Sequence, residues 1–147
     1  MPHLSGQVTP WGPLIHVIVS ASGPRVSALT QAGQAAPQPV LAKLVVDTGA
    51  SLTAIDVSIL NQLGLSPTGK TPIHTPSTAG SPHQANQYDV GLTIFGHNNS
   101  LAFISVALPV IDGSFRPQGI DGLLGRDVLA SSRMIYSGAD SWYGLSF

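Results

Sequence analysis

Residues 41–51 read Leu-Ala-Lys-Leu-Val-Val-Asp-Thr-Gly-Ala-Ser. Leu41 to Val46 is a short apolar run with a β-branched end, which predicts a buried strand. The run ends on Asp47, and a carboxylate placed directly after a buried strand must be hydrogen-bonded or share a proton. Gly49 permits a tight turn and the close approach of another chain segment. The stretch therefore predicts either a polar turn after a core strand or an acid held in a cleft.

Length and composition point to one folded domain, which we assign to residues 1–147. Hydrophobic residues make up 43% of the chain and charged residues 9%, as in globular proteins rather than disordered ones. The net charge is −1 and there is no basic run, so neither nucleic acid nor an anionic membrane is an expected partner. Because cysteine is absent, disulfides and cysteine-bound zinc are excluded. Glutamate is also absent, so seven Asp residues are the chain's side-chain acids.

The sequence offers no sign of a leader, a membrane segment or a metal site. No basic region followed by an apolar run opens the chain, and no apolar stretch approaches the roughly 20 residues that span a bilayer. We expect a cytoplasmic location if the chain is complete, and none can be assigned if it is an excised domain. His74 and His83 lie in one segment, but without a recurrent ligand spacing, so we expect no metal and no cofactor.

Short apolar runs between turn signals predict a mainly β domain. The expected strands are Leu14–Val19, Leu41–Val46, Tyr88–Phe95, Leu101–Val110 and Trp142–Phe147. Asp56 is expected to cap a short helix that ends near Gly64.

Two segments are predicted to leave the compact body. Residues 20–39 are rich in Ala, Gln, Gly, Ser and Pro and show no periodicity, which predicts a long mobile surface loop. At most a short strand near Arg25 to Leu29 is expected within this loop. Residues 71–88 place extended-favouring stretches on both sides of Gly80, which predicts a protruding hairpin with a flexible tip.

A second informative stretch covers residues 119–129, Gly-Ile-Asp-Gly-Leu-Leu-Gly-Arg-Asp-Val-Leu. Two large aliphatic residues are followed by Gly125, and a short helical pattern begins near Arg126. Gly125 would allow a tight crossing from strand to helix with close backbone packing.

The two stretches together resemble the retropepsin-like, or retroviral-type, aspartic proteases. In that family Asp-Thr/Ser-Gly-Ala/Ser follows an apolar strand, and two hydrophobic residues with a Gly, often extended by Arg-Asn/Asp, come later. Here residues 47–51 and residues 123–127 match these motifs about seventy-five residues apart. The helix ending in Leu63-Gly64-Leu65 is more similar to cellular and bacterial members than to viral ones. The resemblance implies a closed, orthogonal β-barrel of the acid-protease type with one or two short helices and a flap hairpin.

The resemblance also implies an activity, namely hydrolysis of peptide bonds by water held between two carboxyls that share one proton. Since the chain has a single Asp-Thr-Gly, the second carboxyl is expected from Asp47 of another copy in a homodimer. Thr48 would hydrogen-bond across that interface, and Gly49 would offer its carbonyl to a peptide or protein substrate.

Other residues take family roles by position. Substrate contacts are implied for Ala50, Ser51, Thr75, Ser77, Thr78, Ala79, Gly80 and Ser81. Packing behind the catalytic loop is implied for Leu123, Leu124, Gly125 and Arg126. Viral relatives often carry a carboxylate where Ser51 or Leu52 falls, as a partner for the arginine. Because neither position is acidic here, Arg126 is expected to bind neighbouring backbone.

Two other hypotheses remain at this point. The chain could be a catalytically silent peptide-binding or dimerisation module that keeps the fold. Alternatively, Asp47 could pair with Asp121 of the same chain.

Overall fold

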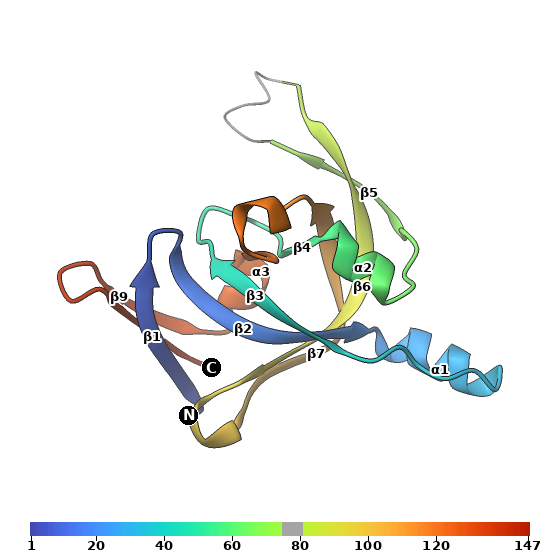
Figure 1. Cartoon of the computed structure of the whole chain (residues 1–147), viewed down its shortest axis with the longest axis horizontal. Coiled ribbons are helices and arrows are strands. Elements are labelled where there is room, and N and C mark those ends of the chain that lie inside the picture. Colours follow the sequence, from blue (N-terminus) through green and yellow to red (C-terminus); the bar gives the residue numbers. More distant parts are fainter. Residues whose placement is uncertain (75–80) are drawn as a thin grey trace.

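The computed structural model describes residues 1–74 and 81–147, which form ten strands, three short α-helices and two 3-10 turns (Figure 1). The strands are β1 (His3–Thr9), β2 (Gly12–Ala21), β3 (Val40–Val46), β4 (Ala54–Asp56), β5 (Gly69–Ile73), β6 (His83–Phe95), β7 (Leu101–Gly113), β8 (Gly122–Leu124), β9 (Arg133–Ser137) and β10 (Trp142–Ser146). The helices are α1 (Gly23–Gln31), α2 (Val57–Gln62) and α3 (Arg126–Leu129), and the 3-10 turns are His97–Asn99 and Arg116–Gln118. None of the helices in this part of the chain is long and apolar enough to cross a bilayer.

Six strands close into a barrel, which confirms the predicted mainly β fold. Their order is β6-β7-β4-β8-β3-β2, and β2 pairs back onto β6 through residues such as Val19 opposite Leu92. Along β2 the residues Ile15, Val17 and Val19 are buried and alternate with more exposed ones. Because successive side chains of a strand point to opposite faces, this alternation fills the barrel with one apolar set.

Two parallel strand pairs lie next to each other in the barrel wall. β3 runs parallel to β8, β4 runs parallel to β7, and β4 and β8 pair antiparallel. Residues 47–53 and residues 125–126 therefore meet where their strands end. A Cβ atom at position 125 would lie 2.5 Å from the carbonyl carbon of Leu52, so only glycine fits this crossing.

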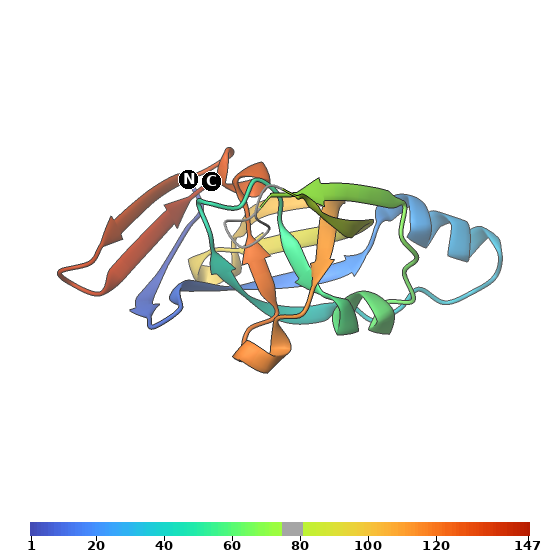
Figure 2. The same ribbon diagram turned by 90° about the horizontal axis from the view of Figure 1, so that it is seen from above.

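The prediction of a loop over residues 20–39 is wrong for its first half. Residues 23–31 form α1, which projects from one end of the barrel (Figures 1 and 2). The Ser22 side chain accepts a hydrogen bond of 3.3 Å from the Arg25 backbone N–H, and Pro24 stands in the first turn. Leu29 is the one helix residue that is buried, so no amphipathic stripe marks the helix in the sequence. Residues 34–39 are irregular, as predicted.

The hairpin predicted over residues 71–88 is present. β5 and β6 pair antiparallel from Gly69 opposite Gln87 to Ile73 opposite His83. The ribbon rises away from the barrel above the ends of β3 and β4 (Figure 1). The predicted contact residues Thr75, Ser77, Thr78, Ala79 and Gly80 lie outside the described residues.

A second sheet extends the barrel at the end opposite α1 (Figures 1 and 2). β1 pairs with β10 through residues 3–7 and with β2 only through residues 8–9, and β10 in turn pairs with β9. Figure 2 shows β9 and β10 as a hairpin that reaches away from the barrel body. The two chain termini lie close together in this sheet, where the Phe147 N–H donates to the Pro2 carbonyl at 3.1 Å.

Asp56 is the helix cap that the sequence predicts, and it also anchors a distant loop. Its Oδ1 accepts from the Ser58 N–H at 2.9 Å and from the Ser58 hydroxyl at 2.6 Å. Its Oδ2 accepts from the N–H groups of Phe115 and Arg116, both at 2.8 Å. Burial, at 3% exposure, raises the pKa, but the hydrogen bonds from Ser58, Arg116 and Phe115 outweigh it and lower the pKa to about 2.

Because of Asp56, the free energy of unfolding should decrease as the pH is lowered through the acid range. Its folded-state pKa lies below the unfolded value of 3.8, so its stabilisation is complete above about pH 5 and is lost as the pH falls toward 2. The difference in unfolding free energy between wild type and Asp56→Asn should shrink by about 2 kcal/mol between pH 5 and pH 2. Urea titrations followed by tryptophan fluorescence measure it. Asp140→Asn, in an exposed turn, is the matched control, and an equal effect there would contradict the assignment.

Candidate active site

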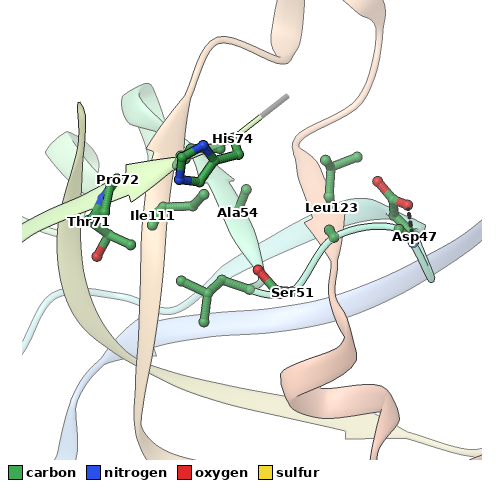
Figure 3. Close-up of a pocket in the computed structure, with 12 residues that line it drawn as sticks. Asp47, Ser51, Ala54, Thr71, Pro72, His74, Ile111 and Leu123 are labelled. Carbon is green, nitrogen blue, oxygen red and sulfur yellow. Dashed lines mark hydrogen bonds between the residues drawn. The ribbon is translucent and has the colours of Figure 1, made fainter. Parts of the chain in front are cut away.

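A cleft of about 430 Å³ opens between the loop after β3 and the hairpin strand β5 (Figure 3). Its lining residues are Asp47, Gly49, Ala50, Ser51, Leu52, Ala54, Thr71, Pro72, Ile73, His74, Ile111 and Leu123. In Figure 3, Asp47 stands at one end of the cleft and His74, Pro72 and Thr71 stand at the other. Most of the wall between these ends is aliphatic. The cleft is thus an apolar channel with one carboxylate at its end.

Asp47 is held by the turn that follows it. Its backbone N–H donates to the Leu124 carbonyl at 2.9 Å, which fixes the end of β3 against β8. Its Oδ1 accepts from the Gly49 N–H at 2.8 Å, and its carbonyl accepts from the Ala50 N–H at 3.2 Å. A Cβ atom at position 49 would press on Oδ1 at 3.1 Å, so glycine leaves the carboxylate room. Asp47 remains partly exposed, with its other oxygen free of protein donors among the described residues.

The other six Asp residues are placed elsewhere, and the six residues outside the described ranges contain none. Five accept hydrogen bonds within the fold, namely Asp56, Asp112, Asp121, Asp127 and Asp140. Asp89 lies on β6, and none of the six lines the cleft.

The hypothesis that Asp121 completes a pair with Asp47 fails on geometry. Asp121 accepts from the Lys43 N–H at 2.8 Å and forms an ion pair of 3.2 Å with Arg116. Lys43 precedes Asp47 by four residues of one strand, roughly 13 Å at the usual rise. None of the other six Asp residues of this sequence therefore places a second carboxylate at the cleft.

The second motif holds the loop that carries Asp47 by bonding to its backbone carbonyls. The Arg126 side chain donates from Nη1 to the carbonyls of Thr48, at 2.8 Å, and Gly49, at 3.3 Å. Its backbone N–H donates to the Ala50 carbonyl at 2.8 Å. Arg126 therefore binds neighbouring backbone, as predicted from the absence of an acid at positions 51 and 52.

Thr53 and Asp127 form further hydrogen bonds that the sequence did not predict. Thr53 is fully buried and donates to Asp127 twice, from its N–H at 2.9 Å and from its hydroxyl at 2.8 Å. The same hydroxyl accepts from the Gly125 N–H at 3.1 Å. Asp127 belongs to the second motif, which was a signal, but its partner is 74 residues away and carries no motif of its own.

The remaining predicted site residues lie in the cleft, behind the loop that carries Asp47, or outside both. Ala50 and Ser51 line the cleft, whereas Ser81 is exposed and does not. Leu124 and Gly125 are buried behind the loop, as expected. Leu123 differs from the prediction, because adjacent residues of a strand face opposite sides and it points into the cleft. Thr48 is exposed and faces away from the cleft, toward a cavity it shares with Arg126.

Seven cleft residues were not predicted as site residues, namely Leu52, Ala54, Thr71, Pro72, Ile73, His74 and Ile111. They come from the loop before β4, from β4, β5 and β7, and from the position after β5, so only the folded barrel brings them together. In the described part of the chain, no cluster of three or more His, Cys, Asp or Glu residues could hold a metal ion.

Comparison with known proteins agrees with this geometry. A family model described as aspartyl protease matches residues 25–128, more than two thirds of the chain. The chain belongs to the aspartyl protease family. Both motifs fall inside the matched region, together with the hairpin between them. A search of curated protein sequences gives no match.

Solved structures place this family member among the retropepsin-like folds. A retropepsin-like aspartic protease from Rickettsia conorii matches with a TM-score of 0.59 and 16% identity, over 99% of this chain and 90% of the other. EIAV protease in complex with the inhibitor HBY-793 matches with a TM-score of 0.43 and 16% identity, over 80% and 85%. The retroviral protease-like domain of Ddi1 from Leishmania major gives 0.39 and 15%, over 85% and 82%. The first of these confirms the fold.

Removing the Thr53 hydroxyl should destabilise the packing of the Asp47 loop against residues 125–127. Thr53→Val keeps the shape but leaves the Gly125 N–H and one Asp127 oxygen with fewer partners, which should destabilise the fold by about 2 kcal/mol. Thr53→Ser keeps the hydroxyl and should lose about 1 kcal/mol or less. Urea unfolding of both variants at neutral pH measures the difference. If Thr53→Val were as stable as Thr53→Ser, the hydrogen bonds of the Thr53 hydroxyl would contribute nothing to the free energy of unfolding.

Proposed function

We propose that the protein is an aspartic endopeptidase whose catalytic pair consists of Asp47 from two copies of the chain. The observation that carries this proposal is the isolation of Asp47, because every other side-chain carboxylate of the chain lies outside the cleft. A single carboxylate cannot both accept a proton from water and donate one to the peptide. A two-fold axis near Asp47 would supply the second group.

The chemistry needs one proton shared between the two carboxyls. The ionised Asp47 takes a proton from water as the water oxygen bonds to the peptide carbonyl carbon, while the protonated Asp47 gives its proton to the carbonyl oxygen. Collapse of this intermediate breaks the C–N bond, and the amine nitrogen leaves with a proton from the pair. The products are a carboxylic acid and an amine. No metal or covalent nucleophile takes part in this scheme.

The walls of the cleft indicate what a substrate presents. Ala54, Ile111 and Leu123 lie side by side on paired strands, with Leu52 and Ile73 beside them. An apolar side chain would be buried there with a gain of about 25 cal/mol per Å². The protease is therefore proposed to cleave peptides that carry a hydrophobic residue next to the scissile bond. Ala50 and Ser51 would contact the peptide from the loop side.

The β5–β6 hairpin is proposed to cover the bound peptide. Thr71, Ile73 and His74 already form one wall of the cleft, so the hairpin needs no new position to contact a ligand. Closing the cleft would exclude water other than the attacking molecule. The contacts predicted for Thr75, Ser77, Thr78, Ala79, Gly80 and Ser81 remain predictions.

Asp47→Asn should abolish cleavage. The amide accepts no proton from water, so the rate on an unstructured protein substrate should fall by at least about 10³-fold. The fold should persist, because Asn can still accept the Gly49 N–H bond. Mass spectrometry of cleavage products across pH measures the activity, with Asp140→Asn as a fully active control. Full activity in Asp47→Asn would contradict the proposal.

Mixing the two proteins tests whether the pair is shared between chains. If each site needs Asp47 from both copies, equimolar mixing after dissociation leaves about a quarter of the dimers with two aspartates. A site complete within one chain would leave half of the activity instead. A statine-type transition-state mimic distinguishes the silent alternative, since a binding module would be stabilised by it without turning over any peptide.

A further inference from the structure

The end of the cleft that lies farthest from Asp47 carries a group able to hold a positive charge. His74 follows β5 directly and lines the cleft. Figure 3 shows its imidazole ring on the side opposite Asp47, with Ala54 and Leu123 between the two. No lysine or arginine is among the described residues that line the cleft. The cleft therefore has its acid at one end and an imidazole at the other.

The neighbours of His74 at this end offer a ligand no side-chain hydrogen-bond donor. The Thr71 hydroxyl donates to Oε1 of Gln87 at 2.8 Å, so its proton is already used. Pro72 and Ile73, which also line the cleft, have no polar side-chain atom. Among the described residues at this end, the imidazole is thus the group that can donate to a substrate side chain.

The charged and titratable groups near the β5–β6 hairpin lie outside the cleft. Asp112 on β7 accepts two hydrogen bonds from β6, both at 3.0 Å. Lys70 on β5 and His83 on β6 are exposed, and none of these three residues lines the cleft. Asp47 is the other titratable residue that lines the cleft together with His74. The charge on a bound peptide is therefore sensed by these two groups, one at each end.

The apolar wall between the two ends sets how far from the scissile bond a contact with His74 lies. Leu123 is paired with Ala54, and Ala54 with Ile111, on the adjacent strands β8, β4 and β7. At the usual spacing between strands this row spans about 10 Å. Because an extended peptide advances about 3.4 Å per residue, a side chain that reaches His74 belongs to a residue about two to four positions from the scissile bond.

We propose that His74 is a specificity-determining residue that binds an acidic substrate side chain about two to four residues from the scissile bond. This inference rests on the proposed function and adds a feature of its substrate. A protonated imidazole donates a charge-assisted hydrogen bond to a carboxylate, and imidazoles gain their charge between about pH 8 and pH 5. The aspartate pair keeps one negative charge when it shares one proton, so it repels an acidic side chain beside the scissile bond. The preferred peptide is thus apolar next to the scissile bond and acidic farther away.

Peptides that differ only in one Glu or Gln test this subsite. In a peptide that the wild-type protein cleaves or binds, Glu and Gln replace in turn each residue within about four positions of the scissile bond. At about pH 5.5 the ratio of kcat/KM for Glu over Gln should reach about fivefold at one or more positions two to four residues away, and at about pH 8 it should fall below about twofold. Glu is ionised at both pH values, and the ratio cancels the titration of the Asp47 pair because both peptides meet the same pair.

Substitutions at position 74 assign the preference to this side chain. His74→Gln removes the charge and should bring the Glu/Gln ratio to about one at both pH values. His74→Lys should keep the preference for Glu at about pH 8, because lysine stays charged there. His16→Gln is the matched control, since His16 is exposed on β2 and lies outside the cleft. Circular dichroism checks that each variant is folded.

The outcomes separate this subsite from the proposed chemistry. Equal rates for Glu and Gln peptides at every position, or a preference for Glu that survives His74→Gln, overturn the role of His74. If cleavage is then still lost in Asp47→Asn, the catalytic proposal stands alone. If Asp47→Asn cleaves as well as the wild type, the catalytic proposal fails. In that case the affinities of the Glu and Gln peptides, measured by fluorescence anisotropy, test His74 by the same ratio.

Discussion

The close crossing of the chain at Gly125 is the constraint on which the rest of the site depends. The backbone of Leu52 and Thr53 passes so near that no side chain fits at position 125. Since the two segments touch, they can hydrogen-bond directly. The backbone N–H groups of Asp47 and Arg126 donate to the carbonyls of Leu124 and Ala50, and the Gly125 N–H donates to the Thr53 hydroxyl. The loop that carries Asp47 is thus fixed by short bonds to a segment some 75 residues away. Positioning of a reactive group by rigid surroundings is what efficient acid–base chemistry requires.

Much of the fold and the core of the site could be predicted from the sequence because their signals are local. The apolar run before Asp47, the Asp56 cap and the two stretches flanking Gly80 each identify an element within a few residues. β4 and β8 were missed because three residues are too short for any periodicity. α1 was missed because it buries only one side chain and so has no amphipathic pattern. Its sequence signals were the Ser22 cap and Pro24 in the first turn.

The unpredicted parts of the site share a physical cause. Ala54, Ile111 and Ile73 become neighbours of Asp47 only when three separate strands align, and sequence spacing says nothing about that register. Leu123 is different, since strand alternation alone would have separated it from Leu124 and turned it toward the cleft. The hydrogen bonds between Thr53 and Asp127 could not be predicted for a similar reason. Asp127 belongs to a recognised motif, but nothing in the sequence marks Thr53 as its partner.

The anchoring of Asp56 has a consequence for how the protein would respond to acid. Because four donors hold its pKa at about 2, this carboxylate stays ionised in mildly acidic solution in the folded protein. The β4–α2 junction and the backbone at Phe115 and Arg116 therefore keep their common anchor in mildly acidic solution, and a change of behaviour measured there would not reflect loss of the Asp56 anchor.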